Sequence, residues 1–272
     1  MTSAVERALE EIRGGATDVK ICDVIVRPAG AKALADALRT STSARSLKIR
    51  FGGIGVAGAE ALADALKHSK TMHTLGLTFS FVGPRGAAAL ADAMKHSKSM
   101  RDLWLDGNHI GDEGSRALAD ALMHSKTMQK LHLCSNHIGS EGAAALAGAL
   151  TLSTSMRTLW LYNNLIGCVG AEALADAIKR NTSLLKMSLE QNYIGPRGAA
   201  ALVDAALHSS SLKVLMTGIP SVDRALENAE TAVRPLWAFV EGEFTPGSLA
   251  HLLSCQDGDH AWMVRVVRFL VL

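Results

Sequence analysis

One pattern recurs along most of this chain at a constant spacing of 28 residues. Its clearest copy is Met100-x-x-Leu-x-Leu-x-x-Asn-x-Ile-Gly111, in which alternating leucines are followed by an asparagine and an Ile-Gly pair. Seven steps of this length lead from position 19 to position 215 without an insertion. A period in this range, kept over so many units, is typical of a solenoid in which each unit packs only against its neighbours.

Each unit divides into a strand half and a helix half. In the strand half, Leu103 and Leu105 alternate with outward-facing side chains, which is the period of two expected of a β-strand. In the helix half of the second unit, Leu62 and Leu66 are four residues apart among alanines, so one helical face is apolar. Helices are wider than the ~4.8 Å between strands, so a stack of such units must curve. We therefore expect an α/β horseshoe of about seven to eight repeats, with a parallel sheet on the concave side and helices on the convex side.

Three segments are expected along the chain. Residues 1–18 should form a capping helix, because Ala8, Leu9 and Ile12 share one helical face before Gly14-Gly15. The repeats should occupy residues 19–218. Residues 219–272 lack the period and should form a helical C-terminal cap or tail, in which 261–272 could be helix or strand. Terminal units of a solenoid need caps because they otherwise expose a sheet edge and a core face.

The composition argues against several classes of function. The formal net charge of +2 indicates neither nucleic acid nor an anionic membrane as the main partner. No run of the chain approaches the ~20 apolar residues that span a bilayer, and the charged N-terminal stretch lacks the apolar core of a secretory signal. The four cysteines lie far apart without a CxxC pair, so we expect reduced thiols, no metal and no cofactor. A cytoplasmic protein is the resulting expectation.

An asparagine follows the strand in four consecutive units. Where the chain leaves a strand and turns inward, its backbone N–H and C=O groups would be buried without partners. An amide side chain supplies donors and an acceptor for them, so this column should be structural. The column comprises Asn108, Asn136, Asn164 and Asn192. The outer units carry other residues at this position and should be less regular.

The unit Leu-x-Leu-x-x-Asn-x-Ile-Gly, followed by Gly-Ala-x-Ala-Leu-Ala-x-Ala-Leu, resembles the ribonuclease-inhibitor-like class of leucine-rich repeats. The resemblance covers roughly residues 16–218 and is closest to the repeat region of NOD-like receptors. The same class of repeat occurs in the Ran GTPase-activating protein. The resemblance implies a horseshoe that recognises other proteins. The chain has no GxxxxGK[ST] phosphate-binding loop, and it lacks the long acidic tail typical of the Ran regulator.

Two groups of residues could suggest chemistry. His-Ser-Lys recurs after the helices, at His68, His96 and His124, with His208 in the last unit. Helices lie roughly 8–10 Å apart, too far for shared metal ligands, and a helix C-terminus favours His and Lys through its dipole. His132 and Cys134 share a strand with Asp106 beside them, but residues two apart on a strand are about 6.6–7 Å apart, beyond hydrogen-bond reach. Neither group indicates a catalytic or metal site.

The outward strand positions are more informative, because the scaffold requires no particular residue there. Trp104 and Trp160 lie two strands apart with His132 between them, and Tyr162 adjoins Trp160. These aromatics could simply stack on one another, or they could form the centre of a binding surface flanked by charges. The candidate partner-binding residues are Trp104, Asp106, His132, Trp160, Tyr162 and Glu190. The cations Lys20, Lys48 and Arg50 at one end should assist the encounter with a partner more than the final affinity.

Two functions follow from these features. The first is a non-catalytic protein–protein interaction scaffold that binds a partner protein on the concave face, with no small-molecule substrate. The alternative, which rests on the resemblance alone, is a GTPase-activating protein for a Ran-like small GTPase. Measuring GTP hydrolysis by Ran with and without the chain would discriminate between them.

Overall fold

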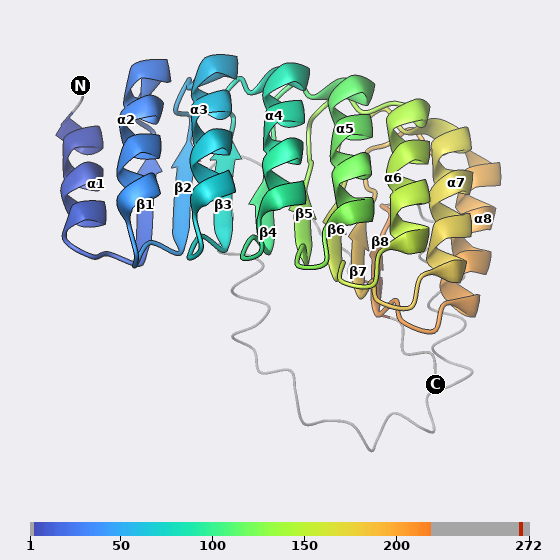
Figure 1. Cartoon of the computed structure of the whole chain (residues 1–272). Helices are drawn as coiled ribbons and strands as arrows, with labels where there is room; N and C mark the ends of the chain where they lie inside the picture. The colour runs from blue at the N-terminus through green and yellow to red at the C-terminus, as the bar shows by residue number, and fades with distance from the viewer. Residues whose placement is uncertain (1–2, 219–266, 269–272) are drawn as a thin grey trace.

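The computed structural model describes residues 3–218 and 267–268, and within them helices alternate with strands from one end to the other (Figure 1). The helices are α1 (Ser3–Arg13), α2 (Arg27–Thr40), α3 (Gly55–His68), α4 (Gly83–His96), α5 (Gly111–His124), α6 (Ser140–Leu152), α7 (Gly167–Arg180) and α8 (Pro196–His208). The parallel strands are β1 (Asp18–Cys22), β2 (Ser46–Arg50), β3 (Thr74–Thr78), β4 (Asp102–Trp104), β5 (Lys130–His132), β6 (Thr158–Trp160), β7 (Lys186–Ser188) and β8 (Val214–Met216).

The strands lie in one open sheet in the order in which they occur in the sequence. Each residue is paired with the one 28 positions later, as in Val19 with Leu47 and Leu103 with Leu131. The period read from the sequence is therefore the register of the sheet, and the predicted solenoid is confirmed. Pairing continues beyond the short central strands, because the Leu105 N–H donates to the His132 carbonyl at 2.9 Å.

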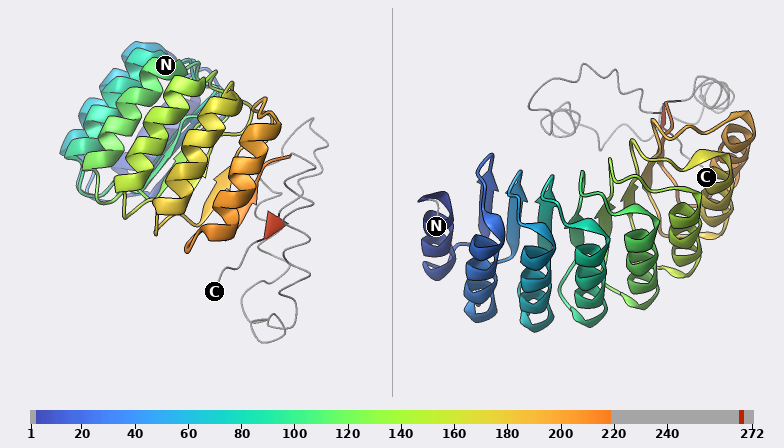
Figure 2. Two further views of the ribbon diagram at one scale, coloured as in Figure 1. Left: turned by 90° about the vertical axis from the view of Figure 1, so that its right-hand side faces the viewer. Right: turned by 90° about the horizontal axis from the view of Figure 1, so that it is seen from above.

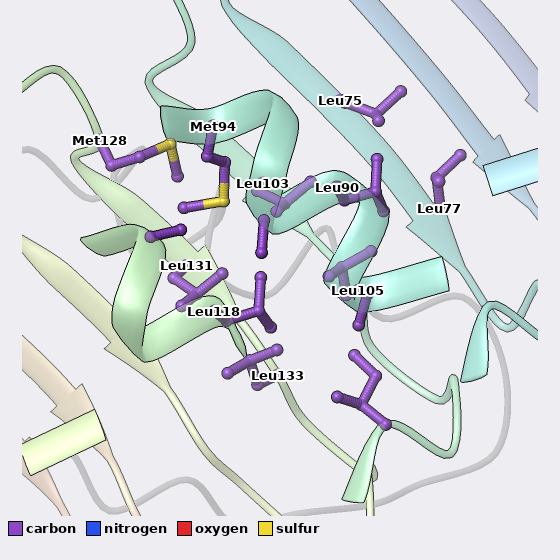
Figure 3. Packing of buried hydrophobic residues seen from close by; sticks show 14 of the residues in the cluster. Leu75, Leu77, Leu90, Met94, Leu103, Leu105, Leu118, Met128, Leu131 and Leu133 are labelled. Carbon is purple, nitrogen blue, oxygen red and sulfur yellow. The ribbon is translucent and has the colours of Figure 1, made fainter. Parts of the chain in front are cut away.

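The helices line the convex side and the strands the concave side of the curved array (Figure 2). Between these layers lies a continuous core of leucine, methionine and alanine, part of which is drawn in Figure 3. Leu75, Leu103 and Leu131, at equivalent positions of consecutive strands, are all fully buried. A glycine in the first turns of each helix from α2 to α8 allows close approach to the preceding helix. At Gly86, for example, an added Cβ would lie 3.0 Å from the Cβ of Ala59.

At the N-terminal end, α1 packs against α2 and β1 and buries Val5, Ala8, Leu9 and Ile12. At the other end, the two-residue strand β9 (Val267–Arg268) pairs antiparallel with β8. The remainder of the segment 219–272, for which the sequence predicts a helical cap or tail, lies outside the described residues. No helix in the described part of the chain is long and apolar enough to cross a membrane.

Candidate functional site

The asparagine column joins consecutive turns through its side chains. Asn136 Oδ1 accepts the backbone N–H groups of Asn108 at 2.9 Å and Ile110 at 3.3 Å. Its Nδ2 donates to the carbonyls of Leu105 at 2.9 Å and Cys134 at 3.0 Å. Asn136 is fully buried, so the Asn108 and Ile110 N–H groups and the Leu105 carbonyl would otherwise lack a partner, whereas the Cys134 carbonyl also accepts the Gly107 N–H at 2.8 Å. The side chain thus replaces bonds that the sheet cannot make where the chain turns.

The last position of this column differs from the others. Asn192 Nδ2 donates to three carbonyls, but its Oδ1 is buried without a partner among the described residues. The turn it faces is also different, because the Leu165 N–H donates to the Ile138 carbonyl at 2.7 Å. In the regular turns the equivalent residues, His109 and His137, have left-handed backbones instead. The bond network therefore weakens toward the C-terminal end of the column.

A row of aromatic side chains crosses the middle of the concave sheet. The register places His132 between Trp104 and Trp160. The Trp104 and His132 rings stack with centroids 4.9 Å apart, and the Trp160 ring is tilted against His132 at 6.0 Å. All three side chains are half-buried. We call Trp104, His132 and Trp160 the aromatic row.

Lys48 extends this row across one strand. Its Nζ lies 3.8 Å from the centroid of a Trp104 ring, although Gly76 occupies the strand between them. An added Cβ at Gly76 would lie 3.2 Å from Lys48 Cγ, so the absence of a side chain there makes room for the lysine. The expectation that Lys48 and Arg50 serve mainly to attract a partner is therefore incomplete. Lys48 makes a cation–π contact, and Arg50 lies over the Phe51 ring at 5.0 Å.

The row carries no charge on its central ring at neutral pH. Burial, reinforced by the nearby charges of Lys130 and Lys48, lowers the pKa of His132 to about 3. A neutral imidazole between two indoles makes a continuous apolar platform with Lys48 at one end. The Nε1 of Trp104 is buried with no acceptor among the described residues. A platform of this kind can pack against the aliphatic or planar side chains of a partner.

The second concave column consists of polar groups engaged with their neighbours. The Asp106 carboxylate accepts the Cys134 backbone N–H at 2.8 Å, and burial raises the pKa of Asp106 to about 6. Burial and the adjacent Asp106 raise the pKa of Cys134 well above its usual value, so its thiol stays protonated near neutral pH and is a poor nucleophile. Ser188 donates to the Glu190 carboxylate. Burial and the nearby Glu190 raise the pKa of Tyr162.

A second set of exposed rings lies along the turns between strands and helices, and the sequence analysis missed it. The Phe51 and Phe79 rings stack at 5.0 Å, Phe81 stacks on His109 at 6.3 Å, and His109 on His137 at 5.1 Å. All five residues have positive φ between 50° and 57°. A hollow of about 250 Å³ adjoins them, lined in part by Phe79, His109 and His137. The sequence does carry a signal for this set, because aromatic or imidazole rings stand next to the asparagine position of the repeat in consecutive units.

The repeated histidines after the helices act locally. Nδ1 of His96 lies 2.8 Å from the Asp92 carbonyl, and Nδ1 of His124 lies 2.7 Å from the Asp120 carbonyl. Each ring thus forms a hydrogen bond with one of the last carbonyls of its own helix, where cations and donors are favoured. Within the described ranges, no group of three or more His, Cys, Asp or Glu side chains could hold a metal ion.

The fold and its repeats are those of a leucine-rich-repeat solenoid. A family profile described as leucine-rich repeat matches residues 96–119 and 124–147. No curated protein matches the sequence.

Several solved structures are similar in fold. The actin-binding site 2 of leiomodin-1 has a TM-score of 0.48 at 17% identity, covering 74% of this chain and 98% of that one. The tropomodulin C-terminal domain of Caenorhabditis elegans has a TM-score of 0.45 at 18% identity, covering 54% and 95%. A Bacteroides fragilis protein has a TM-score of 0.43 at 12% identity, covering 74% and 67%.

Proposed function

We propose that this protein is a non-catalytic interaction scaffold that binds a partner protein on its concave face. The observation that carries the proposal is the aromatic row, with Lys48 packed on its end. These side chains occupy sheet positions where the core requires nothing, yet they form an ordered apolar surface. The full helix in each 28-residue unit further supports assignment to the ribonuclease-inhibitor-like class.

The row has the properties of an interface centre. Two tryptophans held by stacking lose little conformational entropy on binding and bury a large area. Tyr162, Asp106 and Glu190 lie on the neighbouring column and would form the polar margin of the contact. Truncating an aromatic anchor at the centre of an interface often costs about 2 kcal/mol or more, which corresponds to roughly thirtyfold in affinity.

The test is affinity capture from a cell extract, followed by measured binding of each captured protein. The wild-type chain is compared with Trp104→Ala/Trp160→Ala, and both are checked by circular dichroism for an unchanged fold. A matched control, Phe79→Ala/Phe81→Ala, removes two exposed rings from the turns instead. We expect partners to be lost by the tryptophan variant and kept by the control. Retention of the same proteins by the tryptophan variant would show that the concave row is not the binding surface.

A further inference from the structure

Three consecutive loops that lead from a helix to the next strand share an unusual composition. They read KHSKTMH from position 67, KHSKSMR from position 95 and MHSKTMQ from position 123, with no acidic residue in any of them. In each loop a buried serine fixes the backbone. Ser69, Ser97 and Ser125 accept the backbone N–H of the residue three positions later at 3.2, 3.1 and 3.3 Å. The lysine after each serine therefore occupies the same place in each repeat.

We call Lys70, Lys98 and Lys126 the lysine edge. All three are exposed, and none forms an ion pair with a residue in the described part of the chain. The lysines three positions earlier behave differently, because Lys67 is paired with Asp92 and Lys95 with Asp120 on the adjacent helices. The lysine edge is thus a row of cations that the fold itself does not neutralise.

The repeat architecture does not require lysine at this position. The equivalent residue is Thr42 in the unit before the lysine edge and Thr154 in the unit after it. The helix dipole does not account for the row either, because each lysine lies two residues beyond the last helical residue and the dipole effect is confined to the last turn. Exposed Arg45 and Arg101 at the starts of nearby strands add positive charge to the same side.

The spacing of the row suits an extended chain. Neighbouring units lie about 4.8 Å apart at the strands and roughly 8–10 Å apart at the helices, so the loops between them have an intermediate spacing. In an extended polypeptide, alternate side chains on one face recur about every 6.6–6.8 Å. Carboxylates at every second residue of such a segment could therefore meet successive lysines.

We propose that the lysine edge docks an extended acidic segment of a protein. The unpaired lysines form a single row, and the half-exposed carboxylates of Asp92 and Asp120 border it on the helix side. Because these carboxylates are already paired with Lys67 and Lys95, the helix side of the described structure offers no second row of unpaired cations for the second strand of a nucleic-acid duplex, whereas a single acidic strand needs no second row. This surface is separate from the concave aromatic row, so its occupant is an additional contact or a second partner.

The test uses a fluorescent peptide of about twelve residues in which glutamate and serine alternate, long enough to span all three loops. Binding is measured by anisotropy at about 50 and about 300 mM salt, because exposed ion pairs weaken as salt rises. The edge variant is Lys70→Gln/Lys98→Gln/Lys126→Gln. The matched control, Arg7→Gln/Arg13→Gln/Lys32→Gln, removes three exposed cations elsewhere and changes the net charge equally.

We expect the edge variant to bind the peptide about tenfold more weakly or worse, since three ion pairs are lost together, and the control to change affinity less than about twofold. A peptide with glutamine in place of glutamate should not bind. Equal weakening in both variants, or no binding to the wild-type chain at the lower salt, would overturn the proposal. If a single-stranded oligonucleotide bound more tightly than the peptide and lost as much affinity in the edge variant, the lysine edge would bind nucleic acid and not an acidic protein segment.

Discussion

A single buried asparagine in each central turn satisfies backbone groups that neither strand nor helix can reach. Asn136 does this with four hydrogen bonds, so Asn136→Ala leaves two N–H donors and the Leu105 carbonyl without their partner, while the Cys134 carbonyl keeps its bond from the Gly107 N–H. Because an unsatisfied buried polar group costs about 1–3 kcal/mol and the turn can relax in part, we expect a loss of about 3 kcal/mol in the free energy of unfolding. Urea denaturation monitored by circular dichroism measures it.

Asn192 is the matched control for this substitution. Its Oδ1 already lacks a partner among the described residues, so Asn192→Ala removes only the bonds made by Nδ2. We expect the smaller loss of stability for Asn192→Ala. If the two variants lost the same amount, the bonds accepted by the Asn136 oxygen would contribute nothing net to the fold.

The neutral His132 in the aromatic row should make stability depend on pH. Its pKa is about 3 in the folded chain, against an ordinary value of 6.5. Below pH 6.5 the His132 side chain is protonated in the unfolded chain but stays neutral in the folded chain. The stabilisation of the folded chain that is present above pH 6.5 is therefore lost as pH falls toward 3. At about 1.4 kcal/mol per pH unit, the loss between pH 7.5 and pH 5 is up to about 2 kcal/mol.

His132→Phe keeps an aromatic ring in the row and removes the titratable imidazole. We expect the variant to lose up to about 2 kcal/mol less than the wild type between pH 7.5 and pH 5, measured by urea denaturation at each pH. Asp106, whose pKa is raised to about 6, acts in the opposite direction: its contribution is complete below pH 3.8 and is lost as pH rises through 6. Asp106 is present in both chains, so its effect cancels. An identical pH dependence of stability in the wild type and in His132→Phe would contradict the prediction.

At the scale of the element, the turns between strands and helices depend on residues with left-handed backbones. Gly107 has φ of +68°, and a Cβ added there would overlap the Phe79 ring. Gly111 has φ of +59° with nothing within 4 Å, so alanine at this position meets only the backbone cost, about 1–2 kcal/mol. We expect Gly107→Ala to lose about 1 kcal/mol more than Gly111→Ala in denaturation, because Phe79 must leave its stack on Phe51. Equal losses would mean that this stack adds no stability.

The strands and helices follow from the sequence because their apolar period is strict. Leu103, Leu131 and Leu159 recur at one spacing, and only one register buries them all. The same spacing predicted the order of rings in the aromatic row. It could not predict that Lys48 reaches Trp104, because that contact depends on a missing side chain in the strand between them. Nor could it place Phe51 and Phe79, since bulky residues are rare at positive φ and only the closed turn keeps them there.

At the scale of the whole molecule, the described helices and strands pack against their immediate neighbours along the chain. Stability in such an array is approximately the sum of the terms for each unit and for each interface between neighbours. A defect should therefore act according to its position. Leu131 in β5 is fully buried near the middle, and Leu47 in β2 is fully buried near the N-terminal end. Alanine at either position should cost about 2–5 kcal/mol locally.

Hydrogen exchange followed by mass spectrometry distinguishes the two defects. We expect Leu131→Ala to speed amide exchange on both sides of β5, in α5 and α6 alike, because units on each side lose a stable neighbour. Leu47→Ala should speed exchange only from α1 to about β3 and leave α7 as protected as in the wild type, since the units beyond the defect remain stacked on one another. A chain that unfolds as one cooperative body would instead show faster exchange throughout for both variants. That result would mean that coupling between repeats is strong enough to spread a local defect along the whole horseshoe.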